Sequence, residues 1–187
     1  MSAQRTTWQK IARRIRVPLG FVCAAIFLYL ARPSLATLAA SIPVVGCGLW
    51  LRGYAAGYVK KNAELTQTGP YAHTRNPLYL GSILIAVGFA VAARSWPMAV
   101  VLVAMFLAIY LPTIRSEEEF LRAHFADFDT YASRVPRLLP RLTPAKTTAS
   151  KGSFSPELYR KHREYNALMG ASAIYAALIA RLLFWPR

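Results

Sequence analysis

Residues 77–114 read PLYLGSILIAVGFAVAARSWPMAVVLVAMFLAIYLPTI, and this stretch fixes the class of fold. It consists of two apolar runs, Pro77–Ala93 and Trp96–Ile114, which are separated only by Arg94 and Ser95. Neither run alternates with a period of two, which argues against strands. About 20 apolar residues in a helix cross a hydrocarbon core that is about 30 Å thick. We therefore expect two membrane helices that pack as an antiparallel pair through a tight turn.

Three further apolar runs flank this pair. They are Val17–Ala31, Leu35–Val59 and Leu168–Trp185. Lipid cannot satisfy free backbone groups, so spanning segments must be helices or a closed barrel, and the missing alternation favours helices. A cleaved signal peptide is disfavoured because Ala31-Arg32-Pro33 is a poor cleavage site. We expect an all-α multi-pass membrane protein, with about five transmembrane helices in a single integral membrane domain over 1–187.

The charge distribution indicates how these helices are oriented. The chain has 23 Lys and Arg residues against 8 Asp and Glu, a formal net charge of +15. With the N-terminus in the cytoplasm, the outside segments hold few basic residues, namely Arg32, Arg94, Arg181 and Arg187. This asymmetry follows the positive-inside rule, so the basic charge needs no nucleic-acid partner. We expect the bilayer, including its anionic headgroups, to be the partner instead.

A polar segment, GPYAHTRNP over 69–77, leads into the run that begins at Pro77. Asn76 followed by Pro77 is typical of a helix N-cap and its first residue. The free N–H groups and the dipole at such a helix start suit a carboxylate or another anion. Gly81 and Gly88 lie on one face of this helix and allow a close approach.

Four functional side chains crowd the start of this helix. They are Tyr71, His73, Arg75 and Tyr79. A helix that is merely capped and anchored in the membrane does not explain why they gather there. We therefore interpret the segment as a candidate binding site.

Three glutamates lie within Arg115–Arg134, which we expect to form a cytoplasmic amphipathic helix. On a helix, four residues share one stripe: Glu117, Leu121, Phe125 and Phe128. The stripe is mostly apolar and should be buried, and a buried carboxylate such as that of Glu117 needs a partner. Glu118 flanks the stripe, and Glu119 faces away, where it can pair with Arg115.

The remaining polar residues give weaker signals. Ser155 and Pro156 are a good helix start for a C-terminal helical extension over about 155–187. The histidines and cysteines, His73, His124, His162, Cys23 and Cys47, show no spacing typical of metal ligands, and we expect no metal site. Arg52, inside an apolar run, is either functional or a snorkelling side chain; both interpretations remain open.

The two polar motifs together resemble the isoprenylcysteine carboxyl methyltransferase family and its bacterial relatives, a branch related to phospholipid methyltransferases. The first half of the signature is Gly69-Pro70-Tyr71 followed by Arg75-Asn76-Pro77-Leu78-Tyr79-Leu80-Gly81. The second half is Glu117-Glu118, Leu121, Phe125, Tyr131 and Val135-Pro136-Arg137-Leu138-Leu139-Pro140. The resemblance covers about 60–140, which we take as the core of the site.

The resemblance implies a cytoplasm-facing pocket for S-adenosylmethionine (SAM) and a methyl acceptor that is lipophilic or embedded in the membrane. The cofactor-binding residues that it implies are Glu64, Leu65, Thr66, Tyr71, Arg75, Asn76, Pro77, Leu78, Tyr79 and Glu117. The candidate catalytic residues are Glu117 and Glu118. The family's eukaryotic pattern has histidine where this chain has Asn76, and its prenylcysteine enzymes have a substrate-binding arginine where this chain has Thr113.

Several functions stay open at this point. The acceptor can be a carboxylate, a lipid amine, or a small apolar thiol or phenol. A nicotinamide-dependent membrane reductase is one alternative, because sterol reductases have a similar C-terminal region. A non-catalytic membrane protein that binds anionic lipid is the other.

Overall fold

The structure, a computed structural model, describes residues 24–60, 63–146 and 152–185. Within these ranges every regular element is helical, as expected for an all-α fold, and residues 24–30 are the described part of a first helix. The other elements in chain order are α2 (Leu35–Ala56), the 3-10 turn η1 (Gly69–Ala72), α3 (Pro77–Ala93), α4 (Trp96–Met105), the π-helical turn η2 (Phe106–Tyr110), α5 (Leu111–His124), α6 (Phe128–Arg134), α7 (Pro156–Lys161) and α8 (Tyr165–Phe184).

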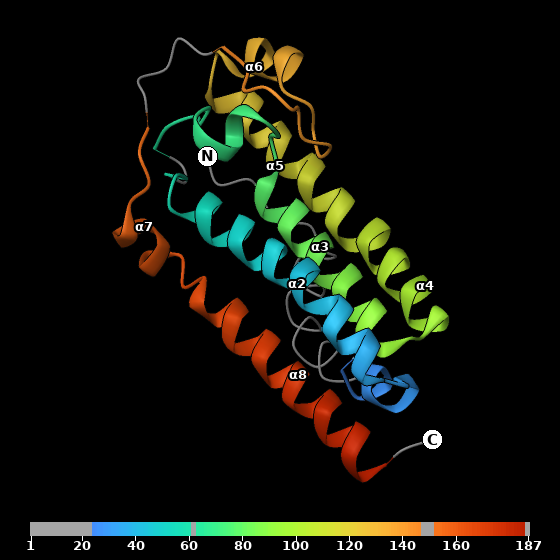
Figure 1. Ribbon diagram of the computed structural model, residues 1–187. Helices are drawn as coiled ribbons and strands as arrows, with labels where there is room; N and C mark the ends of the chain where they lie inside the picture. Colours follow the sequence, from blue (N-terminus) through green and yellow to red (C-terminus); the bar gives the residue numbers. More distant parts are fainter. Residues whose placement is uncertain (1–23, 61–62, 147–151, 186–187) are drawn as a thin grey trace.

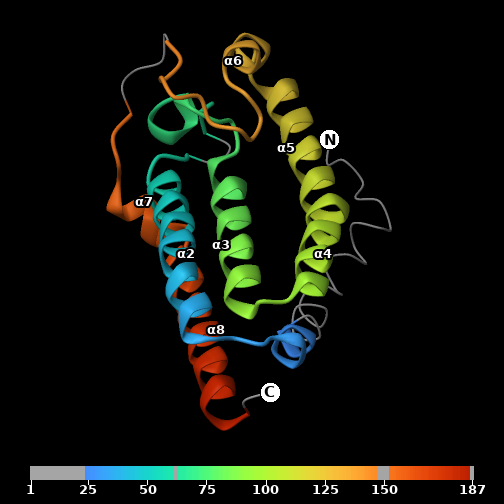
Figure 2. The ribbon, with the colours of Figure 1, turned by 45° about the vertical axis from the view of Figure 1, so that its right-hand side comes forward.

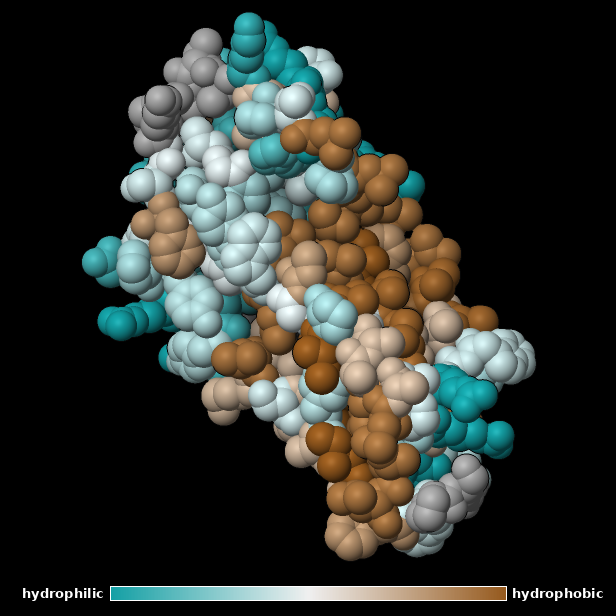
Figure 3. All heavy atoms as spheres, viewed as in Figure 1, coloured by the Kyte–Doolittle hydropathy of each residue, from teal (hydrophilic) through white to brown (hydrophobic). Residues whose placement is uncertain are grey.

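The long helices share one direction, and the polar segments gather at one end of them. Figure 1 shows α2, α3, α4 and α8 running side by side, with η1 and α6 at the same end of the molecule. In Figure 3 apolar residues form a band along the helical body, whereas hydrophilic residues gather around α6 and α7 and in a smaller group toward the opposite end. This distribution is what an integral membrane protein needs.

Three helical segments are long and apolar enough to cross a membrane: α2, the continuous stretch Trp96–His124, and α8. The helix at Pro77–Ala93 is apolar but has only 17 residues. The first expected span, Val17–Ala31, lies largely outside the described residues. Three of the five expected spans therefore meet the length and hydropathy of a membrane helix.

The closest packing in the bundle joins α2 and α3. A Cβ atom built on Gly48 would lie 2.7 Å from the carbonyl oxygen of Gly81, and one built on Gly81 would lie 2.8 Å from that of Gly48. At Gly88 a Cβ would meet Val45 Cγ2 at 2.5 Å. Small residues thus let the two backbones touch, which is how membrane helices commonly associate.

Helix α8 lies against α2 on another side. The hydroxyl oxygens of Ser41 and Tyr175 are hydrogen-bonded at 2.8 Å. Leu178 and Ala171 are buried with Val45 in the main apolar core. The C-terminal helix is therefore packed into the bundle and forms part of the same body.

The turn between α3 and α4 is as short as expected, but the two helices do not pack closely. Arg94 ends α3 in the left-handed conformation, with φ 47°, and Trp96 begins α4. Figure 2 shows the two helices diverging from this turn. An apolar groove of about 500 Å³ lies between them, so the two helices do not pack along their lengths as the expected antiparallel pair would.

The expectation of one amphipathic helix over Arg115–Arg134 was also wrong, because this segment forms the end of α5 and the separate helix α6. Helix α5 continues from α4 through the π-helical turn and ends at His124, where Phe125 takes an extended conformation. The chain turns here because three residues of the next segment are buried in a second apolar core. They are Phe128, Tyr131 and Val135, which pack against Leu65, Leu121 and Phe125.

We predict that replacing Gly48 with Leu destabilises the protein by about 1–3 kcal/mol, because the new side chain overlaps the backbone of α3. Gly46, on the same helix, has no atom within 4 Å of a built Cβ and gives the matched control, Gly46→Leu. Apparent unfolding temperatures in detergent measure both variants. Equal temperatures for the two would contradict glycine-dependent packing of α2 on α3.

Candidate active site

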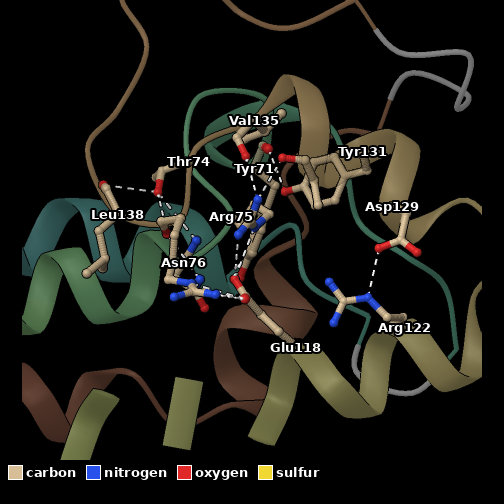
Figure 4. A network of polar contacts seen from close by, with 12 residues as sticks. Tyr71, Thr74, Arg75, Asn76, Glu118, Arg122, Asp129, Tyr131, Val135 and Leu138 are labelled. Atoms are coloured by element: carbon tan, nitrogen blue, oxygen red, sulfur yellow. Dashed lines mark hydrogen bonds and ion pairs between the residues drawn. The ribbon is translucent and has the colours of Figure 1, made fainter. Parts of the chain in front are cut away.

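A carboxylate held between two arginines joins the two polar motifs. Arg75 donates from Nε and Nη2 to Oε1 of Glu118, at 3.0 and 2.9 Å. Arg137 donates from Nε and Nη2 to Oε2 of the same carboxylate, at 3.0 and 2.6 Å. Glu118 is only 5% exposed. Figure 4 shows Glu118 and Arg75 pointing toward one another from different elements.

Arg75 also fastens the segment that follows α6. Its Nη1 donates to the carbonyl oxygens of Ala132, at 2.8 Å, and Val135, at 3.0 Å. Its backbone N–H donates to the carbonyl oxygen of Pro136 at 2.9 Å. Arg75 of the first motif therefore holds the end of the second motif, by charge-assisted hydrogen bonds from its guanidinium and by one bond from its backbone N–H.

The loop before α3 (residues 69–76) and the strap that follows α6 (residues 135–141) are joined by further hydrogen bonds. Thr74 Oγ1 donates to the carbonyl oxygens of Arg137 and Leu138. The hydroxyl of Tyr131 donates to the carbonyl oxygen of Tyr71 at 2.8 Å. These bonds satisfy buried polar groups and fix how the two motifs face each other.

The start of α3 is where the sequence predicted it. Asn76 occupies the N-cap position and Pro77 is the first helical residue. The Asn76 side chain does not cap the helix, however, because its Nδ2 donates to the carbonyl oxygen of Arg137 at 3.1 Å. The helix start therefore has no side-chain cap and faces a cavity.

This central cavity has a volume of about 420 Å³. Its lining includes every residue that the sequence singled out as a cofactor-binding or catalytic candidate: Glu64, Leu65, Thr66, Tyr71, Arg75, Asn76, Pro77, Leu78, Tyr79, Glu117 and Glu118. The folded chain thus brings all of these residues around one space. Their roles there stay predictions.

The glutamates do not lie as the sequence predicted. The buried stripe of α5 carries Glu118, and Glu117 is exposed at the cavity wall. Glu119 is exposed and does not line the cavity, and none of the ion pairs among the described residues joins it to Arg115. The prediction that Glu117 is the buried carboxylate was wrong, because the stripe was drawn through Phe125, where the helix has already ended.

Two charged residues in the cavity wall form an ion pair that sequence reasoning missed. Arg52 of α2 donates from Nε and Nη2 to the carboxylate of Glu164, each at 3.0 Å. The two residues lie 112 positions apart. In the sequence, Glu164 is an acid between a basic stretch and an apolar run, and that unusual position is the feature that could have identified it as a candidate site residue.

Acidic residues are concentrated around the central cavity. Its four acidic lining residues are Glu64, Glu117, Glu118 and Glu164, which is half of the 8 acids in the sequence. Its basic lining residues are Arg52 and Arg75. Three of these acids are in ion pairs: Glu64 with Lys60, Glu118 with Arg75 and Arg137, and Glu164 with Arg52. Glu117 is in none of the ion pairs among the described residues, so its carboxylate can face a positively charged group of a ligand.

Tyr71 and Tyr131 line the central cavity as buried tyrosines. Burial raises the pKa of Tyr71 far above its ordinary value, and neighbouring Tyr131 and Glu117 raise it further. Burial also raises the pKa of Tyr131. Both side chains therefore stay neutral and serve as hydrogen-bonding groups.

We predict that Arg75→Gln frees the strap from the loop before α3, because it breaks a buried ion pair, for which the cost is typically 3–5 kcal/mol. Hydrogen exchange should become at least about tenfold faster over 128–141 and stay unchanged in α8. The control is Arg122→Gln, which removes an ion pair with Asp129 that is exposed and screened by solvent. Similar exchange in both variants would refute the joining role of Arg75.

Comparison with known proteins shows that the part of the chain that contains most of this site matches a family. Residues 38–127 match the phospholipid methyltransferase family. The nickel-cobalt-cadmium resistance protein NccN of Alcaligenes xylosoxydans xylosoxydans is 39% identical over 95 residues, which are 51% of this chain and 44% of that protein. The cobalt-zinc-cadmium resistance protein CzcN of Cupriavidus metallidurans is 36% identical over 110 residues, 59% of this chain and 50% of that protein.

The matched segment thus spans about half the length of these two relatives. No solved structure matches the chain. The matched residues include the loop before α3, the helix start at Asn76, and Glu117 and Glu118 of α5, which line the central cavity together with residues beyond the match such as Glu164. Over residues 38–127, which are just under half of the chain, the protein thus resembles the phospholipid methyltransferase family.

Proposed function

We propose that this protein is a SAM-dependent integral membrane methyltransferase that acts on a lipophilic acceptor. The observation that carries the proposal is the central cavity, in which both halves of the sequence signature and half of the chain's acidic residues meet. The family is one of membrane methyltransferases, which agrees with this chemistry.

The residues of the cavity fit SAM. A volume of about 420 Å³ lies within the range of about 300–1,000 Å³ that is usual for ligand sites. SAM carries a sulfonium and an ammonium, which suit the Glu117 carboxylate in the wall, and a carboxylate, which suits the uncapped start of α3. When bound, SAM supplies a methyl group that is already activated for transfer to a nucleophile.

Each residue then has a distinct task. The start of α3 and the Tyr71 phenol hold the polar end of the cofactor. Glu117, exposed in the wall, accepts hydrogen bonds from its amine or ribose hydroxyl groups, and we keep it as the catalytic candidate. Both oxygens of Glu118 already accept bonds from Arg75 and Arg137, so we assign Glu118 to positioning the wall.

The two substrates reach the cavity from different phases in this proposal. SAM comes from the water at the end of the molecule that carries η1 and α6, which we assign to the cytoplasm because of the positive-inside rule. The acceptor comes from the bilayer between helices. The protein contributes orientation and a cavity from which water is excluded.

We predict that the detergent-solubilised protein binds S-adenosylhomocysteine (SAH) in calorimetry, and that Glu117→Ala weakens this binding about 10- to 100-fold. That range corresponds to the loss of a hydrogen bond to a charged group. Glu119→Ala is the matched control, because Glu119 lies two residues away and does not line the cavity. Unchanged binding in Glu117→Ala would remove Glu117 from the site.

Activity separates the proposed enzyme from its alternatives. The methyltransferase moves tritiated methyl from SAM into the solvent-extractable fraction of membranes, whereas a reductase consumes NADPH without such transfer. A non-catalytic protein that binds lipid shows neither reaction and binds no SAH. The names of the two relatives refer to metal resistance, and because the match spans about half of each, we do not carry that property over to this chain.

A further inference from the structure

The ion pair of Arg52 and Glu164 occupies a part of the central cavity to which the family resemblance assigns nothing. Glu164 lies between α7 and α8, beyond the matched residues 38–127. Arg52 lies one turn before the end of α2, and its Nη1 also donates to Ser82 Oγ and to the carbonyl oxygen of Leu78. None of Arg52, Ser82 and Glu164 belongs to the proposed cofactor-binding set.

Glu164 forms part of two hollows at once. It lines the central cavity, and it also lines a groove of about 500 Å³ beside α2, α7 and α8. Most of the other residues of this groove are aromatic or aliphatic: Leu49, Trp50, Tyr54, Phe154, Tyr159 and Leu168. The groove is thus a mostly apolar surface that leads to a single carboxylate on the cavity wall.

The carboxylate of Glu164 retains hydrogen-bonding capacity. Its Oε2 accepts from Arg52 Nε and its Oε1 from Arg52 Nη2. A carboxylate has about four acceptor sites, so an N–H or O–H donor can still bind to each oxygen. The guanidinium, by contrast, is engaged by Glu164, Ser82 and Leu78, which fixes its orientation.

We propose that Glu164, oriented by Arg52, binds the polar head of the methyl acceptor while the acceptor's apolar part lies in the aromatic groove. This inference rests on the proposed function and deepens it. The position of Glu164 carries it, because this one carboxylate lines both hollows and still has free acceptor sites. The acceptor is then a neutral head that donates a hydrogen bond, such as an amine, a phenol or a thiol. On transfer its N, O or S lone pair takes the methyl group from the sulfonium of SAM, SAH is left, and the proton of the head is released to water. A carboxylate head is excluded, because it would face Glu164.

The test compares Glu164→Gln with Glu157→Gln, an exposed acid on α7 that does not line either hollow. The probes are dodecylamine, 4-dodecylphenol, dodecanethiol and dodecanoate, together with the membranes of cells that express the protein. Methyl transfer from tritiated SAM gives KM and kcat. Two further readouts need no turnover: SAH affinity, and the shift in unfolding temperature that each probe causes in nanodiscs without SAM.

We expect the wild-type protein to methylate at least one hydrogen-bond-donating probe and not dodecanoate. Glu164→Gln should raise KM for that probe at least about tenfold, reduce the temperature shift that the probe causes, and leave SAH affinity within about twofold. Glu157→Gln should match the wild-type protein in all three. An unchanged KM and temperature shift in Glu164→Gln would overturn the inference, and so would methylation of dodecanoate by the wild-type protein.

A charge-swapped double variant, Arg52→Glu with Glu164→Arg, tests whether Glu164 binds the acceptor head or only forms a structural ion pair. It preserves the pair but places a cation where the acceptor head binds, so SAH affinity should stay near that of the wild-type protein while methyl transfer falls at least about tenfold below it. Recovery of wild-type transfer would show that the pair is only structural, and this variant decides the matter if Glu164→Gln does not fold.

A wild-type protein that neither binds SAH nor transfers methyl to probes or membranes would instead overturn the proposed function, and this inference with it.

Discussion

The site depends on one carboxylate, that of Glu118, which is held on both sides by guanidinium groups. Removing a carboxylate from water is costly unless each oxygen finds charged partners, and Arg75 and Arg137 supply them from two different segments. Because Arg75 immediately precedes the start of α3, and Arg137 lies on the strap after α6, this single contact sets where the helix start lies relative to α5. The central cavity is the space that remains between them.

Charge and packing act together around that space. The glycine contact between Gly48 and Gly81 brings α2 against α3, and this proximity carries Arg52 to the cavity wall. Elsewhere the chain is strongly basic, as expected of segments that stay beside anionic headgroups. Four of the 8 acids line the central cavity, and three of them are neutralised by arginine or lysine partners. The same fold therefore leaves basic groups in excess outside the cavity and places mostly paired charges around it.

The sequence predicted features that depend on neighbouring residues better than those that depend on distant ones. Apolar runs indicated the helices, and the pair Asn76-Pro77 located the start of α3, because both follow from local preferences. The helical stripe chose Glu117 for burial although Glu118 is the buried acid, since periodicity cannot show that the helix ends before Phe125. The ion pair between Arg52 and Glu164 joins residues 112 positions apart, and only the packing of α8 on α2 creates it.

The most direct measurement of the central claim is an experimental structure of the full chain with SAH bound. The account predicts the ligand in the central cavity, its carboxylate at the start of α3 and its amine or ribose against Glu117, with Glu118 still between its two arginines. A ligand bound elsewhere would contradict the account, and so would a structure in which Asn76 and Glu117 are separated by solid packing.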